Sequence, residues 1–180
     1  IVRLIYRADF GFRIGDYKTG LRYVMLFSFI FSIYTVGGYV ISYYNNMLVD
    51  YAFPLNCQNV IGTLSFQLLL SGTSEEILFR ALPISLMVLV MGKSICVKVG
   101  KLDITLETLI AALLFSIAHI NWTLFPLTLS YNGFQVIYAL ILGVIYGKTY
   151  QKSGSVLYPM IMHGISNVVM VGVGYLFSML

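Results

Sequence analysis

The stretch SGTSEEILFRALP, residues 71–83, places three charged side chains inside a long apolar segment of the chain. Glu75, Glu76 and Arg80 lie within an apolar run that extends from about Val60 to Met91. A charged group at membrane depth costs about 2.5–3.5 kcal/mol even on lenient insertion scales, so such residues face the interior of a helix bundle and usually serve a function. The stretch therefore predicts a buried polar site within a membrane-embedded helix.

The composition of the whole chain also indicates a membrane protein. Hydrophobic residues make up 59% of the 180 residues and charged residues only 10%, whereas a typical soluble domain carries about 25% charged residues. Such a chain has too little polar surface to cover itself in water. The length predicts a single membrane-embedded domain over residues 1–180. The segment 1–22 does not resemble a cleavable signal peptide, because charged residues interrupt it.

Apolar stretches that can cross a hydrocarbon core of about 30 Å recur along the chain. They cover about residues 23–44, 60–91, 104–120, 132–150 and 155–180. We therefore expect an all-α fold, a polytopic membrane bundle of about five transmembrane helices. The second stretch is either one long tilted helix or two helices that break at Ser71 and Gly72 and restart behind a cap at Thr73 or Ser74.

The distribution of lysine and arginine predicts the orientation of these spans. Basic residues lie before the first stretch, between the second and third, and between the fourth and fifth: Arg3, Arg7, Arg13, Lys18, Arg22, Lys93, Lys98, Lys101, Lys148 and Lys152. The alternate loops, about 45–59 and 121–131, contain no lysine or arginine. The positive-inside rule predicts a cytoplasmic amino terminus and an outside carboxyl terminus. This distribution explains the net charge of +4, so we expect no nucleic-acid partner.

Three smaller features have structural interpretations. Cys57 and Cys96 fit no metal or redox spacing and lie on opposite predicted membrane faces, so we interpret both as unpaired structural residues that are buried, as free cysteines commonly are. Gly143 and Gly147 form a GxxxG pair that predicts a closely packed neighbouring helix. The basic, aromatic segment 1–22 is either an interfacial helix or an unstructured cytoplasmic tail.

Strongly polar residues inside the apolar stretches recur at helical spacing. They are Glu75, Glu76, Arg80, Glu107, His119, His163 and Asn167. Three pairs of residues are spaced four apart, so the two residues of each pair share a helical face: Glu76 with Arg80, Phe115 with His119, and His163 with Asn167. We expect Glu107, near the end of its stretch, to be solvated. A lone histidine would favour a packing role, bonded to a backbone carbonyl, but the whole set favours a function.

The polar set contains the groups needed to hydrolyse an amide with activated water. A carboxylate held away from water can take and return a proton, and a histidine can share this work. Histidine and asparagine can also donate hydrogen bonds to a developing oxyanion. Arg80 can pair with Glu76 and leave Glu75, about 100° around the helix, free to face a cavity.

Other catalytic chemistries fit the polar set less well. No serine occurs in a GxSxG setting and neither cysteine is near the motifs, which disfavours a nucleophile, although a triad assembled in space stays open. Glutamate with two histidines is a known zinc ligand set, but HExxH is absent. We therefore expect neither a metal nor a cofactor.

Three motifs carry a resemblance to a known family. EEILFR at 75–80, FSIAH at 115–119 and HGISN at 163–167 follow the order EExxxR, FxxxH and HxxxN. The chain resembles the CPBP family of intramembrane proteases, which includes CAAX proteases and bacteriocin-processing enzymes and is also called the Abi family. The resemblance covers the motif-bearing core, about residues 60–170, and implies a metal-independent, glutamate-dependent endopeptidase with an all-helical core.

The resemblance also implies roles for individual residues. Glu75 would activate water together with His119, and His163 and Asn167 would form the oxyanion hole. Supporting roles would fall to Glu76, Arg80 and Phe115. Two departures are visible. Ala81 stands where many members have glycine, and five spans are fewer than is common, which leaves open a compact member or a chain without its upstream helices.

The resemblance suggests a hydrolase in a bacterial cell membrane that processes peptides or small-protein termini, such as bacteriocin, pheromone or CAAX-like substrates. The small size favours bacterial peptide processing over eukaryotic CAAX cleavage. An alternative is a non-catalytic partner of a membrane sensor protein, or an immunity protein, that retains the polar residues. A third, weaker alternative is a proton or ion pathway. The oligomeric state stays open.

Overall fold

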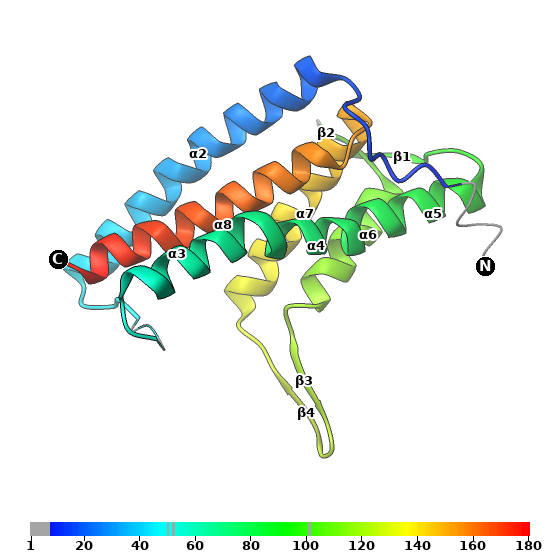
Figure 1. The fold of residues 1–180 in the computed structure, drawn as a ribbon. Helices are drawn as coiled ribbons and strands as arrows, with labels where there is room; N and C mark the ends of the chain where they lie inside the picture. Colours follow the sequence, from blue (N-terminus) through cyan, green and yellow to red (C-terminus); the bar gives the residue numbers. More distant parts are fainter. Residues whose placement is uncertain (1–7, 50, 52, 101) are drawn as a thin grey trace.

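The structure is a computed structural model that describes residues 8–49, 51, 53–100 and 102–180. It is mostly helical (Figure 1), with helices at each predicted apolar stretch: α2 (Tyr17–Tyr44), α3 (Cys57–Phe66), η1 (Gln67–Ser71), α4 (Gly72–Glu76), η2 (Ile77–Ala81), α5 (Leu82–Met91), α6 (Leu106–Ile117), α7 (Gly133–Ser153) and α8 (Leu157–Ser178). Two antiparallel hairpins interrupt them: β1 (Cys96–Val99) with β2 (Leu102–Thr105), and β3 (Asn121–Leu124) with β4 (Leu127–Ser130). The helical class is confirmed, whereas the hairpins were not predicted.

Local sequence explains where several of these helices begin and end. Side-chain oxygens of four residues accept a hydrogen bond from the backbone N–H three residues on, and so cap α2, α3, α6 and α7: Asp16, Asn56, Thr105 and Asn132. Gly92 and Gly154 follow α5 and α7 with φ angles of 70° and 66°, a backbone conformation that glycine adopts without strain.

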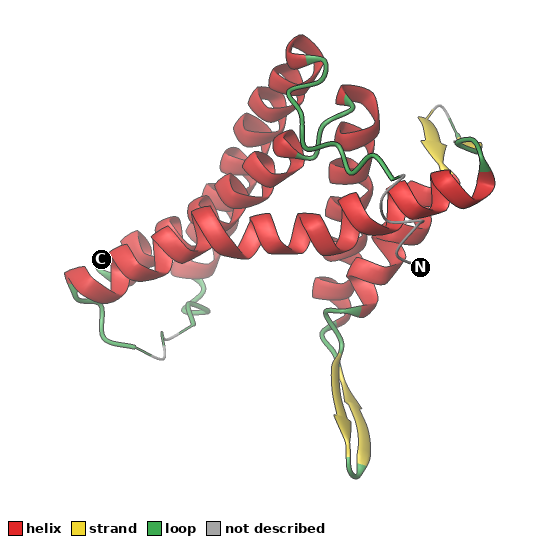
Figure 2. Ribbon diagram, turned by 45° about the vertical axis from the view of Figure 1, so that its right-hand side comes forward, coloured by secondary structure: helices red, strands yellow, loops and turns green. Residues whose placement is uncertain are grey.

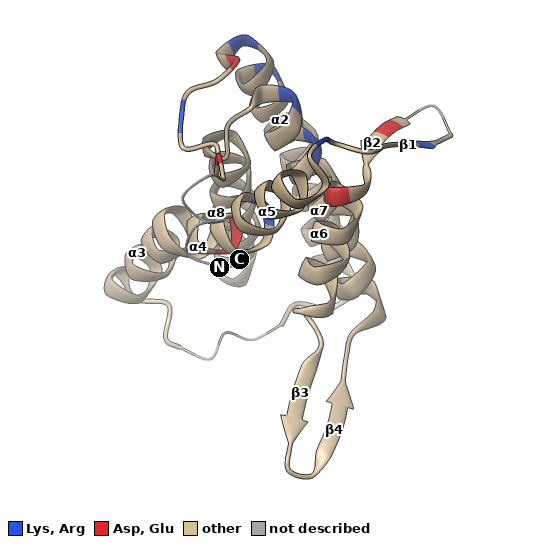
Figure 3. Ribbon diagram, turned by 90° about the vertical axis from the view of Figure 1, so that its right-hand side faces the viewer, with Lys and Arg blue, Asp and Glu red and all other residues tan. Residues whose placement is uncertain are grey.

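Two of the helices are long and apolar enough to cross a membrane by length and composition, α2 and α8. Helix α6 is shorter, with 12 residues. Figure 1 shows α2 lying alongside α8, while α6 and α7 pack against each other. In Figure 3, lysines and arginines gather at the end of the molecule that carries the start of α2 and the β1–β2 hairpin, and none lies on β3–β4.

The segment from Cys57 to Met91 is one continuous helical rod (Figure 2). Ser71 and Gly72 both have helical dihedral angles, with φ of −58° and −60°, so the expected alternative of a break at this point is wrong. Ser74 caps no restart, since its hydroxyl donates to the Ser71 carbonyl at 3.0 Å. The π-helical turns η1 and η2 flank the short α4 turn, and such turns are frequent at functional sites.

Small residues set the closest helix contacts. A Cβ added to Gly143 would lie 2.9 Å from the Cα of Ala112, and one added to Gly147 would lie 2.8 Å from Cγ2 of Thr108. The neighbour predicted by the GxxxG pair is therefore α6. Helix α8 likewise approaches the rod, because a Cβ on Gly72 would lie 2.8 Å from the backbone nitrogen of Gly164.

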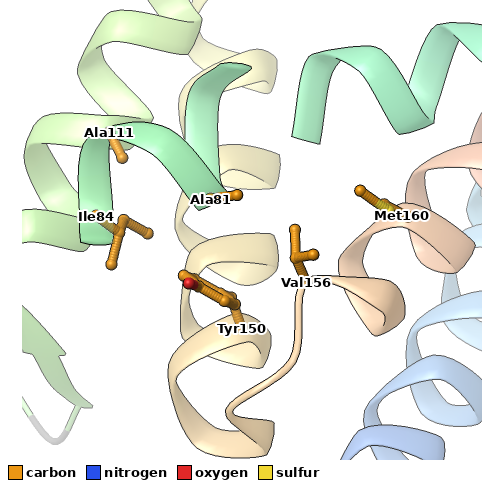
Figure 4. Close-up of a cluster of buried hydrophobic side chains, with 6 residues drawn as sticks. All are labelled: Ala81, Ile84, Ala111, Tyr150, Val156 and Met160. Carbon is orange, nitrogen blue, oxygen red and sulfur yellow. The ribbon is translucent and has the colours of Figure 1, made fainter. Parts of the chain in front are cut away.

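A buried apolar cluster ties the second half of the rod to α6, α7 and the start of α8 (Figure 4). It consists of Ala81, Ile84, Ala111, Tyr150, Val156 and Met160. Ala81, the residue at which the sequence departs from the expected glycine, is fully buried in this cluster. Its methyl group is therefore accommodated by the packing of this chain.

The amino-terminal loop packs across the ends of α7 and α8. The Gly11 carbonyl accepts from the Val156 N–H at 3.0 Å, and the Ser153 carbonyl accepts from the Asp16 N–H at 2.7 Å. Over residues 8–16, neither an interfacial helix nor an unstructured tail is correct, because these hydrogen bonds hold an extended loop. Residues 1–7 of the predicted segment lie outside the described part of the chain.

Both cysteines are free and exposed. The expectation that they are buried structural residues is wrong for a local reason. Cys57 is the first residue of α3 and Cys96 is the first residue of β1, so each lies beside a loop rather than inside a packed helix.

Candidate active site

His163 lies between the two adjacent glutamates of the rod. Its Nδ1 is 2.7 Å from Oε1 of Glu76, and its Nε2 is 3.7 Å from Oε2 of Glu75. The close approach of α8 to α4 at Gly72 and Gly164 brings these side chains together. Because the Glu76 carboxylate can only accept, Nδ1 donates to it and Nε2 is the nitrogen left for other partners.

Glu76 and Arg80 form the ion pair that their spacing predicts. Oε1 of Glu76 is 2.8 Å from Nη1 of Arg80, and both side chains are 0% exposed. The Arg80 guanidinium is covered by aromatic rings, with its carbon 4.1 Å from the centre of Phe115 and 5.3 Å from that of Tyr146. The cation–π contacts add to the attraction. One carboxylate oxygen, Oε1 of Glu76, thus contacts both Arg80 and His163.

Glu75 is the more accessible carboxylate. Its side chain is 35% exposed, and its Oε1 accepts a hydrogen bond from the Ser71 hydroxyl at 3.2 Å. The same hydroxyl accepts from Nδ2 of Asn167 at 3.4 Å. Ser71 therefore links Glu75 on the rod with Asn167 on α8. A separation of 3.7 Å between Glu75 and His163 is too long for a direct hydrogen bond, although one water can bind both groups.

His119 lies at the carboxyl end of α6, in the non-helical turn that follows the helix. Its Nδ1 is 2.8 Å from the Phe115 carbonyl, and the two rings pack edge to face with centres 4.6 Å apart. This carbonyl bond is the one expected of a packing histidine, and it leaves Nε2 free. Among the described contacts, Glu75 meets His163 rather than His119.

A cavity of about 910 Å³ adjoins these groups. His119, His163 and Asn167 line one part of it, and aromatic side chains from α2 and α7 line much of the rest, among them Tyr34, Phe134 and Tyr138. This volume is in the range of sites that hold small ligands or short peptide segments. Glu75 is not among the lining residues, but its Oε2 is 3.7 Å from Nε2 of His163, which is.

The family model for the type II CAAX prenyl endopeptidase Rce1-like family matches residues 57–169. The chain belongs to this family. All three motifs, from Glu75 to Asn167, fall within the matched residues, and the predicted relationship to CAAX proteases is confirmed. No curated protein and no solved structure matches the chain. This Rce1-like protein therefore belongs to a membrane protease family, and that membership supports a protease function on peptide or protein substrates at the membrane.

Sequence reasoning missed two residues of the Rce1-like site. Ser71 was considered as a helix break and as one of several nearby serines, yet it joins Glu75 to Asn167. Its spacing of four residues from Glu75 is the signal that could have revealed this link. Tyr146 is fully buried, its ring lies 5.2 Å from that of His163, and its hydroxyl is 2.9 Å from that of Ser166. No local motif marks Tyr146, because it comes from α7.

The expectation that Glu107 is solvated is wrong. Its side chain is 0% exposed, and Oε1 accepts a hydrogen bond from Nε2 of Gln151 at 2.9 Å. Thr105 and Thr108 both donate to Oε1 of Gln151. Helix α7 covers the first turn of α6, so Glu107 belongs to a separate buried network. The described residues of the Rce1-like chain contain no group of three or more His, Cys, Asp or Glu side chains that could hold a metal ion.

Proposed function

We propose that this Rce1-like protein is an intramembrane endopeptidase in which Glu75 activates water without a metal ion. The observation that carries the proposal is the position of Glu75, which is partly exposed and faces a histidine fixed by a buried ion pair. A carboxylate beside a held histidine can accept a proton from a bound water. The role of Glu76 and Arg80 is then to position His163.

The chemical steps follow from the groups at the site. Glu75 removes a proton from water as the water oxygen bonds to the carbonyl carbon of the scissile peptide. The oxyanion accepts hydrogen bonds from His163 and from Nδ2 of Asn167. When the C–N bond breaks, Glu75 returns the proton to the leaving amine. The hydroxyl of the water stays on the new carboxyl group, and no atom changes its oxidation state. His119, whose Nε2 is free beside the cavity, orients the water or the substrate.

Purified protein in phospholipid vesicles is the material for a direct test. Peptides from the host membrane would be added and cleavage products identified by mass spectrometry. We expect cleavage to continue at an unchanged rate in the presence of strong metal chelators, because the proton acceptor is a carboxylate rather than a metal-bound water. Loss of cleavage on chelation, with recovery on adding zinc, would contradict the metal-independent mechanism.

We further propose the multi-pass arrangement of about five spans, with a cytoplasmic amino terminus and an outside carboxyl terminus. Under this topology the cavity lies in the outer half of the membrane, since its lining residues include the end of α2, the end of α6 and the start of α7. Among the described residues, the lining contains no lysine, arginine, aspartate or glutamate and includes several aromatic rings. Such a cavity suits an apolar peptide that reaches the site from outside, as in processing of secreted peptides.

The two exposed cysteines allow this topology to be measured. In intact cells, a membrane-impermeant maleimide should label a Cys96→Ser variant, which retains Cys57, but not a Cys57→Ser variant, which retains Cys96. Permeabilising the cells should expose Cys96 to the reagent. Both thiols are accessible in the folded protein, so the difference would report the side of the membrane. The reverse labelling pattern would overturn the orientation.

A further inference from the structure

The β3–β4 hairpin projects from the ends of α6 and α7 away from the helices (Figures 1 and 2). Residues paired across antiparallel strands point to the same face, and successive residues alternate between faces. The observed register places four apolar residues on one face: Trp122, Leu124, Leu127 and Leu129. It places four polar residues on the other: Asn121, Thr123, Thr128 and Ser130. The hydroxyls of Thr123 and Thr128 hydrogen-bond on this polar face.

The apolar face of the hairpin is open. Its side chains are between 53% and 72% exposed, and Phe125 at the tip is 96% exposed. No lysine, arginine, aspartate or glutamate occurs between Glu107 and Lys148. An apolar surface of this kind marks contact with a membrane or with another protein.

The position of the hairpin along the chain favours lipid. Helix α6 has 12 residues, about 18 Å at 1.5 Å per residue, which is shorter than the ~30 Å hydrocarbon core. The distance along α7 from Lys148 to Phe134 is about 21 Å by the same rise. If Lys148 lies at the cytoplasmic boundary, the hairpin therefore begins before the opposite boundary is reached.

The surface that adjoins the hairpin has the same character. Ile137 and Ile141 on the first turns of α7 are 60% and 52% exposed, as expected of a surface that faces lipid in a membrane protease. Trp122 on the hairpin and Tyr131 just after it are residue types that favour the membrane–water boundary.

The hairpin backbone limits how deep it can lie. The outer edges of a two-stranded hairpin leave N–H and C=O groups unpaired, and such groups are not tolerated in hydrocarbon. Lipid headgroups and water at the boundary can satisfy them. The polar face then looks away from the lipid, while the apolar face meets the lipid at this boundary.

We propose that the β3–β4 hairpin is a lipid-binding element that inserts its Trp122, Leu124, Leu127 and Leu129 face into the boundary region of the bilayer. The proposal rests on the membership in a membrane protease family and not on the catalytic role of Glu75. His119 lies directly before the hairpin, Phe134 lies directly after it, and both line the cavity. Lipid contact by the hairpin would thus help to position His119 and Phe134 at the cavity.

Trp122 is the only tryptophan of the chain, so the fluorescence of the native protein reports on this hairpin. Wild-type protein would be reconstituted in phosphatidylcholine vesicles whose lipids carry a nitroxide either near the headgroup or near the chain end. We expect strong quenching by the headgroup-side nitroxide and weaker quenching by the chain-end nitroxide. Iodide in the buffer should quench several-fold less than it quenches N-acetyltryptophanamide.

Two double variants keep Trp122 as the probe. Leu124→Ser with Leu127→Ser removes apolar contact, and we expect lipid quenching to fall several-fold while iodide quenching rises. Thr123→Ser with Thr128→Ser changes two residues of the opposite, polar face and should leave both signals unchanged. Wild-type quenching in the leucine variant would show that the apolar face makes no lipid contact.

If a variant does not fold, the wild-type measurement is sufficient to test whether the hairpin contacts lipid. Full access of iodide to Trp122 without lipid quenching would place the hairpin in water and overturn the proposal. Protection from both iodide and the nitroxide lipids would overturn it as well, because the hairpin would then be covered by protein, such as a second copy of the chain.

Discussion

Glu75→Gln will abolish peptide cleavage while the protein remains folded. Glutamine has the shape of glutamate and can keep the hydrogen bond from Ser71, but it cannot take a proton from water. Loss of a general base lowers rates by about 10²–10⁴-fold. Cleavage rates would be measured by mass spectrometry on purified protein in vesicles, at equal protein amounts checked by thermal unfolding.

Glu107→Gln is the matched control for this prediction. Glu107 is a fully buried glutamate outside the candidate site. It bonds to Gln151 in a separate network, and an amide oxygen can accept the same hydrogen bond. Its cleavage rate should stay close to that of the wild type. A Glu75→Gln variant that cleaves at the wild-type rate would exclude Glu75 as the base. If the wild-type protein itself cleaved none of the peptides, the alternative of a non-catalytic membrane partner would gain support.

Arg80→Met will destabilise the fold by about 3–5 kcal/mol, because it leaves the buried Glu76 carboxylate without its cation. Arg80 and Glu76 are both fully buried, and water does not reach the carboxylate to compensate. The free energy of unfolding would be measured by denaturant titration of the detergent-solubilised protein. Adding Glu76→Gln to Arg80→Met should recover part of the loss, since the second change removes the unpaired charge.

Arg13→Met supplies the comparison for the buried pair. Arg13 and Asp9 form an ion pair with the same spacing of four residues and a similar length of 2.9 Å, but their side chains are 62% and 60% exposed. Exposed pairs contribute about 0–1 kcal/mol. Equal losses in Arg13→Met and Arg80→Met would show that burial of the Glu76–Arg80 pair does not govern its contribution.

The sequence predicted the features that depend on local spacing. The helical segments, the Glu76–Arg80 pair and the tight contact at Gly143 and Gly147 follow from residues three or four positions apart, which is the interval that a helix brings together. The three motifs also predicted the family correctly. Their catalytic roles remain predictions.

Features that depend on distant parts of the chain were not predictable in this way. Glu107 is buried because Gln151, 44 residues later, covers it. Tyr146 reaches His163 only through the packing of α7 against α8. The β3–β4 hairpin did carry a local signal, since polar and apolar residues alternate in Asn121–Leu124 and Leu127–Ser130. That alternation is typical of a strand, but each run is only four residues long within a chain dominated by helical patterns.

A π turn lies on each side of α4, and these two turns affect the direction in which the α4 side chains point around the axis of the rod. In an α-helix each residue advances by about 100°, so one extra residue would rotate everything beyond it by that angle unless a wider turn absorbs it. Here η1 and η2 provide such a turn on both sides of the glutamates. The direction in which Glu75 and Glu76 point around the rod axis can therefore be set independently. Helices α3 and α5 can keep the same side chains against their neighbours while Glu75 and Glu76 point toward α8.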